Sequence, residues 1–435
     1  MKTVFSNCNI IDTENGCAVR HGADITVSDG KIESITDHSS AHPGCRVYDM
    51  SGKYALPGLI NLHVHLFGSG RPSKVLGGGS AQRRLIAFIH TKLGRFVLSR
   101  LVNSAAENQL NSGVTTVRAV GDFCGSDIDL RNALAKGKGG AAGLRVLVSG
   151  PAITVPGGHG DGTFANVADT EEGLVRLVDE NVGRGADLIK ICITGGVMDA
   201  KKKGEPGEVR MNEAQVKAVC DRAHSLGKKV AAHVQSGTGA EIAARGGVDT
   251  IEHGSVLSEE CIELMKSRGG AVVVTYSPAL PNVYLPSSVT KMNELCAYNS
   301  KVVMDSMTIG AKQAMAAGLH VGLGTDASCP FCTQTGTWRE VIYFSKIVGV
   351  PASDALIRAT LGNAEILGLQ NVTGSVSVGK SADIAFYAAN PVEDLNVLRR
   401  PCAVSAGRRF IKKPRPKLNR KTEAILDTVM EEIMK

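Results

Sequence analysis

The stretch Leu56-Pro-Gly-Leu-Ile-Asn-Leu-His-Val-His65 decides the fold, because it predicts a buried strand that ends in two imidazoles. Side chains alternate along a strand, so His63 and His65 point to the same side. Neutral imidazoles are preferred ligands of zinc and similar divalent ions. The alternative is a pair of unrelated surface histidines, and the rest of the chain decides between the two interpretations.

The composition indicates a soluble globular protein with one large domain and a smaller one. The chain has 435 residues, of which 43% are hydrophobic and 50 are glycine. No apolar run reaches the roughly 18 residues of a membrane span, and the N-terminus lacks a secretory signal. Eleven cysteines without a disulfide framework are typical of a reducing cytosol. We expect a cytoplasmic protein without a membrane partner.

The net charge of +7 comes from one segment near the end of the chain. Residues 408–421 hold eight basic residues and no acid, which leaves the remainder nearly neutral. Aromatic residues make up only 4% of the chain, so the sequence lacks the basic, aromatic face of a nucleic-acid-binding protein. We expect this segment to be a solvated connector, with an acidic partner as the alternative.

The middle of the chain alternates helical and strand patterns. Helices are expected, for example, at 82–111, 170–183, 212–226, 258–268 and 299–317. Strands are expected at 59–63, 114–119, 144–149, 187–193, 229–233, 249–252, 271–275 and 320–324. Eight strands alternating with helices predict an α/β fold, a closed parallel (β/α)8 TIM-type barrel, whose active site lies where the strands end.

Both ends of the chain carry β patterns. Residues 24–35 alternate apolar and polar around Asp29-Gly30, a strong hairpin signal, and a similar pattern returns at 374–387. We predict a small β-sandwich domain built from residues 1–56 and 374–412, flanking a barrel at 57–373. Residues 413–435 are predicted to be a basic linker and an amphipathic helix. The apolar face of that helix packs either on its own barrel or on another subunit, and we expect a homo-oligomer.

Histidine, lysine and aspartate side chains that could bind a metal lie on the predicted barrel strands, most of them at the strand ends. Because these ends meet at one rim, we predict that the side chains converge there on a metal centre. They are His63, His65, Lys190, His233, His253 and Asp326.

Lys190 lies within an apolar strand, where burial disfavours its ammonium form. A neutral amine can react with carbon dioxide to give a carbamate, a carboxylate-like group that can bridge two cations. The alternative is a lysine that reaches the rim or pairs with Asp187 or Glu252.

These motifs, with Thr194-Gly-Gly-Val197, Ile251-Glu-His253-Gly-Ser and Gly324-Thr-Asp326-Ala, resemble those of the amidohydrolase superfamily over nearly the whole chain. The similar branch is the one related to imidazolonepropionase, which includes Xaa-Pro dipeptidases and arginine/lysine carboxypeptidases. The resemblance implies two divalent ions, with zinc expected. His63, His65 and Asp326 would hold the more buried ion, His233 and His253 the other, and carboxylated Lys190 would bridge them.

A pair of cations about 3.5–4 Å apart can share a water whose pKa falls toward about 7. Asp326 would accept the proton of the attacking water and return it to the leaving amine. If Asp326 only capped the following helix, the site would lack this proton shuttle.

Three further residues are candidate catalytic or substrate-binding groups. His159, in the glycine-rich segment 156–161, resembles a histidine that contacts the substrate in related peptidases, or it contacts only water. Arg118 could clamp a substrate carboxylate or be structural. Relatives usually show Val-Arg-Asp where this chain reads Val117-Arg-Ala119, so an ion pair with that aspartate is absent, and a salt-bridged structural arginine remains the alternative. Tyr276 could donate to an oxyanion or pack in the core.

The remaining cysteines and histidines carry less weight. Cys329 and Cys332 have redox spacing but no thioredoxin-like context, so we expect them to shape the pocket rim. No chemistry is expected to converge on six histidines, which we assign to the surface or core: His21, His38, His42, His90, His224 and His320.

The leading hypothesis is a binuclear metal-dependent amidohydrolase that cleaves a C–N amide bond of a dipeptide or an N-acyl amino acid. A mononuclear deaminase or imidazolonepropionase would need an acid near the fifth strand, yet His233 is followed by Val-Gln-Ser. A lactonase or esterase would use the same metals and remains open. A non-catalytic relative would have lost ligands, and none is missing from this sequence.

Overall fold

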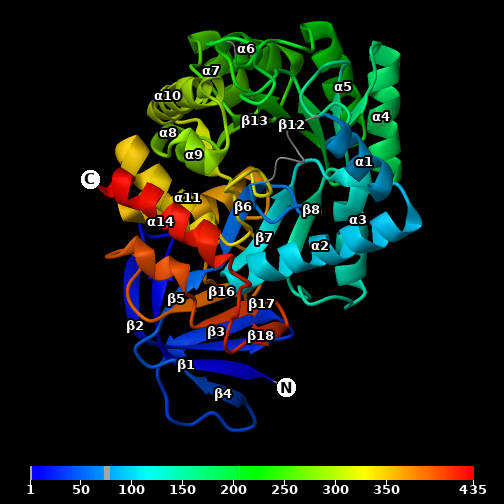
Figure 1. Ribbon diagram of the computed structural model, residues 1–435. Helices are drawn as coiled ribbons and strands as arrows, with labels where there is room; N and C mark the ends of the chain where they lie inside the picture. The colour runs from blue at the N-terminus through cyan, green and yellow to red at the C-terminus, as the bar shows by residue number, and fades with distance from the viewer. Residues whose placement is uncertain (1, 73–78, 205) are drawn as a thin grey trace.

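The computed structural model describes residues 2–72, 79–204 and 206–435. Figure 1 shows a ring of helices around parallel strands, with a second sheet built from both ends of the chain lying below it. The fold is therefore mixed α/β, as predicted.

Eight parallel strands form the inner layer of the part that the helices surround. They agree with the predicted strands to within one residue at each end. In chain order they are β6 (Leu59–Val64), β7 (Val114–Ala119), β8 (Arg145–Val148), β11 (Leu188–Cys192), β12 (Lys229–Val234), β13 (Thr250–His253), β14 (Ala271–Val274) and β15 (His320–Leu323).

These strands pair in two sheets whose edges are joined by backbone hydrogen bonds. One sheet has the order β6-β7-β8. The other runs from β11 to β15, with β9 (Ala152–Thr154) beside β11 and β10 (Ala165–Val167) beside β9. The Asp187 N–H donates to the Val148 carbonyl at 2.7 Å. At the other junction, the Asp326 N–H donates to the His63 carbonyl at 2.8 Å. This arrangement is consistent with a TIM-type barrel and brings the start and end of the strand series together.

Helices connect the strands and cover their outer faces (Figure 1). They are α1 (Gly79–Ile89), α2 (Lys92–Asn111), α3 (Ser126–Ala135), α4 (Glu171–Gly183), α5 (Glu213–Ser225), α6 (Gly237–Gly246), α7 (Glu259–Ser267), α8 (Leu280–Tyr284), α9 (Ser287–Thr290), α10 (Glu294–Ala316), α11 (Thr337–Phe344), α12 (Ala352–Ile357) and α13 (Asn363–Ile366). The described helices include none long and apolar enough to cross a membrane.

The helical pattern predicted over 82–111 is present as two helices, because the helical backbone is interrupted between α1 and α2. Thr91 has an extended backbone there, and its hydroxyl accepts a hydrogen bond from the Gly94 N–H at 3.0 Å. This is an N-cap, which satisfies one of the free N–H groups at the start of a helix.

Strands from both ends of the chain share one sheet. Its order is β18-β17-β16-β5-β1-β2-β3, and β4 pairs with β1. The bounds are β1 (Thr3–Asp12), β2 (Ala18–Ser28), β3 (Lys31–Asp37), β4 (Arg46–Asp49), β5 (Tyr54–Pro57), β16 (Ile384–Tyr387), β17 (Ala403–Ala406) and β18 (Arg409–Ile411). The predicted hairpin is present: β2 and β3 are antiparallel around Asp29 and Gly30, whose φ values are 51° and 81°.

The last helix, α14 (Arg420–Met434), folds back onto the barrel beside α11 (Figure 1). Its apolar residues Leu426, Val429 and Met430 are buried. Arg339, which is 1% exposed, donates to Glu423 at 2.8 Å and to Asp427 at 2.7 Å. Of the two predicted partners for this helix, its own barrel or another subunit, the structure shows the helix packed on its own barrel.

Candidate metal centre

The six predicted site residues lie at the carboxyl ends of the barrel strands or within them. His63 lies near the end of β6 and His65 directly follows that strand. Lys190 lies in β11, His233 lies in β12, and His253 ends β13. Asp326 follows β15. All six are buried, and the most exposed, Asp326, is only 9% exposed.

His63, His65 and Asp326 form the tightest group. Asp326 Oδ1 lies 3.5 Å from His63 Nε2 and 3.2 Å from His65 Nε2. One ligand atom from each residue lies within 4.8 Å of the other two. Two imidazoles and a carboxylate form a donor set typical of zinc and related divalent ions. The residues therefore fit the predicted metal.

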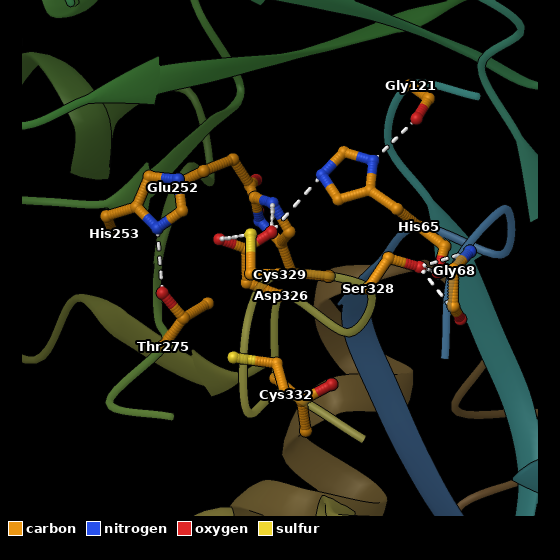
Figure 2. Close-up of polar contacts among 12 residues, drawn as sticks. His65, Gly68, Gly121, Glu252, His253, Thr275, Asp326, Ser328, Cys329 and Cys332 are labelled. Carbon is orange, nitrogen blue, oxygen red and sulfur yellow. Dashed lines mark hydrogen bonds and ion pairs between the residues drawn. The ribbon is translucent and has the colours of Figure 1, made fainter. Parts of the chain in front are cut away.

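Hydrogen bonds orient three of the imidazoles through their Nδ1 atoms. Nδ1 of His63 lies 2.8 Å from Glu252 Oε2, Nδ1 of His65 lies 2.5 Å from the Gly121 carbonyl, and Nδ1 of His253 lies 2.7 Å from Thr275 Oγ1. Figure 2 shows the contacts of His65 and His253. Such bonds fix the tautomer and leave Nε2 available to a metal.

The remaining imidazoles extend this group into a row. The ring centroids of His63 and His253 are 4.8 Å apart, and those of His253 and His233 are 4.6 Å apart. His233 Nε2 lies 3.2 Å from the Gly195 carbonyl, which leaves its Nδ1 as the free ligand atom. The row places His233 and His253 next to the first group, as a second metal site requires.

Lys190 is 2% exposed. Burial lowers the pKa of its amine, and a neutral amine is the form that reacts with carbon dioxide. Within the described part of the chain, no carboxylate lies within 4.0 Å of its Nζ atom: Asp187 pairs with Arg131 and Glu252 pairs with Arg118. The alternative of a Lys190 ion pair with either acid is therefore wrong.

The electrostatics of the site favour neutral imidazoles and an ionised carboxylate. Burial and the nearby Lys190 lower the pKa of His63 to about 4, and burial holds the pKa values of His233 and His253 well below the usual value. Burial alone would raise the pKa of Asp326, but its contact with His65 and the neighbouring histidines hold it well below its usual range. These are the protonation states that bind a cation.

Two site residues have a strained backbone. His253 has a φ of 64° and Asp326 a φ of 52°, in the left-handed region that side chains other than glycine seldom adopt. Strain of this kind persists where the surrounding structure fixes it, and it clusters at functional sites.

The structure shows Arg118 as the salt-bridged structural arginine that was one of its two predicted roles, with Glu252 as its partner. Its guanidinium donates to Glu252 Oε1 at 2.6 Å, to the Leu62 carbonyl at 2.7 Å and to Thr250 Oγ1 at 2.9 Å. Arg118 is also 3% exposed. The guanidinium thus donates its hydrogen bonds to buried groups inside the barrel, and this geometry favours a structural role for Arg118 over binding of a substrate carboxylate.

Tyr276 is fully buried, and its hydroxyl lies 3.2 Å from Thr308 Oγ1. Its N–H donates to Glu340, a buried carboxyl whose pKa burial raises to about 8. The hydroxyl therefore contacts Thr308 of α10, and this geometry favours a packing role for Tyr276 over donation of a hydrogen bond to an oxyanion.

His159 lies beside the imidazole row. Its ring stacks on that of His233, with centroids 4.2 Å apart and an interplanar angle of 13°. Its Nδ1 lies 2.5 Å from Asp199 Oδ2, which leaves Nε2 available. The structure thus places His159 at the candidate centre.

The cysteines of the 329–332 segment lie at the same rim (Figure 2). Cys329 Sγ is 3.4 Å from Asp326 Oδ2. Burial raises the pKa of both Cys329 and Cys332, so both remain neutral thiols. All eleven cysteines of the chain are free.

Sequence reasoning missed the groups that orient the imidazoles: Glu252, Gly121, Thr275 and Asp199. Glu252 had a visible signal, because an acid within an apolar strand must find a buried cation or donor. Gly121 acts through its backbone carbonyl, which no residue pattern reveals.

Comparisons with known proteins identify the family to which this chain belongs. Residues 54–407 match the Amidohydrolase family. A crystal structure of a candidate prolidase from Bifidobacterium longum is 34% identical, covers 99% of both chains and superposes with a TM-score of 0.85. The structure of a Xaa-Pro dipeptidase with bound methionine is 28% identical over 93% of this chain and 98% of its own, with a TM-score of 0.77.

A curated relative, the ochratoxinase of Aspergillus niger, is 28% identical over 68% of this chain. The match spans 64% of the length of that relative. The family match covers most of the chain and includes all six residues of the candidate centre. The chain therefore belongs to the amidohydrolase family.

Proposed function

We propose that this chain is a binuclear metal-dependent amidohydrolase that cleaves the C–N amide bond of a dipeptide or an N-acyl amino acid. The observation that carries the proposal is the row of buried imidazoles around Asp326, in which hydrogen bonds to Nδ1 leave the Nε2 atoms of His63 and His65 facing one carboxylate oxygen. The similarity to a candidate prolidase and to a Xaa-Pro dipeptidase supports a peptide substrate.

The donor set fits two divalent ions, with zinc the best match to imidazole and carboxylate ligands. His63, His65 and Asp326 would hold one ion, and His233 and His253 the other. Lys190, as a carbamate, would bridge the two. When bound, such a pair would lower the pKa of a shared water toward about 7 and polarise the scissile carbonyl.

Asp326 would act as the proton shuttle. Because its pKa lies well below the usual range, it is ionised at neutral pH and accepts the proton released as water attacks the carbonyl carbon. It then returns that proton to the leaving amine as the C–N bond breaks. Its carboxylate oxygen Oδ1 lies between His63 and His65, at 3.5 and 3.2 Å from their Nε2 atoms.

His159 would position the substrate. Its Nδ1 is held by Asp199, so Nε2 can donate to the carbonyl oxygen or to the carboxylate of a dipeptide. The hydrogen bond to Asp199 would fix the orientation of the His159 ring and so the direction of Nε2.

The proposal includes the division of the chain into parts. Residues 57–373 would form the catalytic (β/α)8 barrel, and residues 1–56 with 374–412 a β-sandwich domain. Residues 413–435 would form a linker and the covering helix α14. A cytoplasmic homo-oligomer would act on a small-molecule substrate.

A substrate screen tests the proposal. Metal-stripped protein is loaded with zinc in bicarbonate and assayed on dipeptides and N-acyl amino acids, with Asp326→Asn as the inactive control. We expect hydrolysis by the wild type and a loss of about 10²–10⁴-fold in kcat for Asp326→Asn. Lactones and an aminopurine are assayed in parallel. Turnover of these substrates alone would refute the assignment to amide bonds. No turnover of any substrate would refute the proposed hydrolase activity.

A further inference from the structure

A second group of metal-binding side chains lies in the sheet built from the chain ends. Asp24 is in β2, and His38 and His42 lie in the connection between β3 and β4. One ligand atom from each residue lies within 4.8 Å of the other two. The two histidines had been assigned to the surface or core, yet the fold brings both onto one buried carboxylate.

The Asp24 carboxylate is buried beside both imidazoles, of which His38 is 41% exposed. His38 Nδ1 lies 3.0 Å from Asp24 Oδ1, and His42 Nε2 lies 3.1 Å from Asp24 Oδ2. The Asp24 side chain is 1% exposed. It is fixed by backbone N–H groups of Asn7 at 2.7 Å and Ser39 at 2.8 Å. The carboxylate is thus held in place before any ligand arrives.

His42 supplies an independent observation. Its Nε2 atom is buried and makes no hydrogen bond to any described residue, although a carboxylate oxygen is 3.1 Å away. Buried polar atoms are nearly always satisfied, so this atom needs an explanation. A cation between the imidazoles and the carboxylate would satisfy it, because the nitrogen lone pair would then point at the ion.

The donor types select the class of ion. Two imidazole nitrogens and one carboxylate oxygen suit zinc and similar transition metals, whereas calcium and magnesium prefer oxygen ligands alone. Tetrahedral zinc with bonds of about 2.0–2.1 Å places its ligand atoms about 3.4 Å apart. The observed separations are 3.0 Å from His38 Nδ1 to Asp24 Oδ1 and 3.1 Å from His42 Nε2 to the other oxygen, Oδ2, and each is a few tenths of an ångström shorter than this value.

We propose that Asp24, His38 and His42 form a zinc site separate from the barrel rim, with water in the fourth position. The ion joins the β3–β4 connection to β2, and so stabilises the sheet that the two chain ends share. This inference is independent of the proposed catalytic function, because it involves no residue of the rim.

Zinc counting on the full-length protein tests the site. Metal-stripped wild type, His42→Gln and the control His21→Gln are titrated with zinc against a chromophoric chelator. His21 is an exposed histidine of the same sheet whose Nδ1 lies 3.0 Å from Asn9 Oδ1. We expect His42→Gln to bind one zinc fewer per chain and His21→Gln to match the wild type. Equal zinc binding by all three proteins would overturn the proposal.

A second measurement does not depend on the stability of the variant. Zinc-loaded wild-type crystals are measured on both sides of the zinc absorption edge. An anomalous peak between Asp24, His38 and His42 supports the site, and its absence at full zinc loading overturns it. The peaks at the barrel rim are read separately, so failure of the rim centre is distinguishable from failure of this one.

Discussion

Glu252 binds His63 directly, with Oε2 of the carboxylate 2.8 Å from Nδ1 of the imidazole. Its other oxygen, Oε1, accepts a hydrogen bond from the Arg118 guanidinium at 2.6 Å. Burial alone would raise the pKa of Glu252, but Arg118 and His63 hold it well below its usual range. A buried anion thus fixes the tautomer of a candidate metal ligand and is itself balanced by a buried cation.

Replacing Glu252 by Gln should weaken metal binding without removing a ligand. The amide accepts a hydrogen bond from His63 less strongly than a carboxylate does, so the imidazole becomes a poorer donor to the ion. We expect zinc affinity at the rim to fall about 10–100-fold, measured by chelator competition. The control Glu260→Gln removes an exposed partner of Arg245 and should bind zinc as the wild type does. Unchanged affinity in Glu252→Gln would contradict the orienting role.

The strands were predictable because each is a short β-branched run between helical patterns. β12 (Lys229–Val234) carries His233 as its penultimate residue and β13 (Thr250–His253) ends on His253, and the parallel barrel brings such strand ends together. The six site residues could therefore be proposed from their positions in the sequence alone.

The partners of those residues could not be predicted, because they depend on packing between distant segments. Arg118 meets Glu252 across 134 positions of the chain. The cluster of Asp24 with His38 and His42 depends on how the β3–β4 connection folds over β2. Its His-x3-His spacing was visible, but a loop of unknown path gave no reason to expect a carboxylate beside it.

The buried arginine under the last helix predicts a large effect on stability. Arg339→Met removes a cation that pairs with Glu423 and Asp427, and leaves Glu423 buried without its partner. We expect a loss of about 3–5 kcal/mol in the free energy of unfolding, measured in urea. The matched control Arg245→Met breaks the exposed pair with Glu260 and should cost less than about 1 kcal/mol. If Arg339→Met lost as little stability as the control, the ion pairs of Arg339 would contribute little to the free energy of unfolding.

The depressed pKa values of the rim histidines predict acid sensitivity of the metal-free protein. The pKa of His63 is about 4 in the folded protein, against 6.5 for an unperturbed histidine. Between these values the unfolded chain binds the proton and the folded chain does not, so stability falls as the pH falls. His63 alone contributes a loss of up to about 3 kcal/mol from pH 7 to 4.

Urea unfolding of metal-free protein at several pH values measures this loss. His63→Asn should show a shallower decline over the same pH range, and the exposed control His320→Gln should follow the wild type. A free energy of unfolding that stays constant from pH 6.5 to 4 would contradict the burial of neutral imidazoles at the rim.

The bridging role of Lys190 predicts how many ions the rim holds. In a His42→Gln background, which removes the proposed sheet site, we expect two zinc ions per chain and only one after Lys190→Ala. The truncation leaves a space where the carbamate would lie, so added formate should restore part of the second zinc and of the turnover. The control Lys229→Ala alters an exposed lysine at the start of the neighbouring strand and should retain both ions. Two tightly bound ions in Lys190→Ala without formate would show that the rim holds its metals without a bridging lysine.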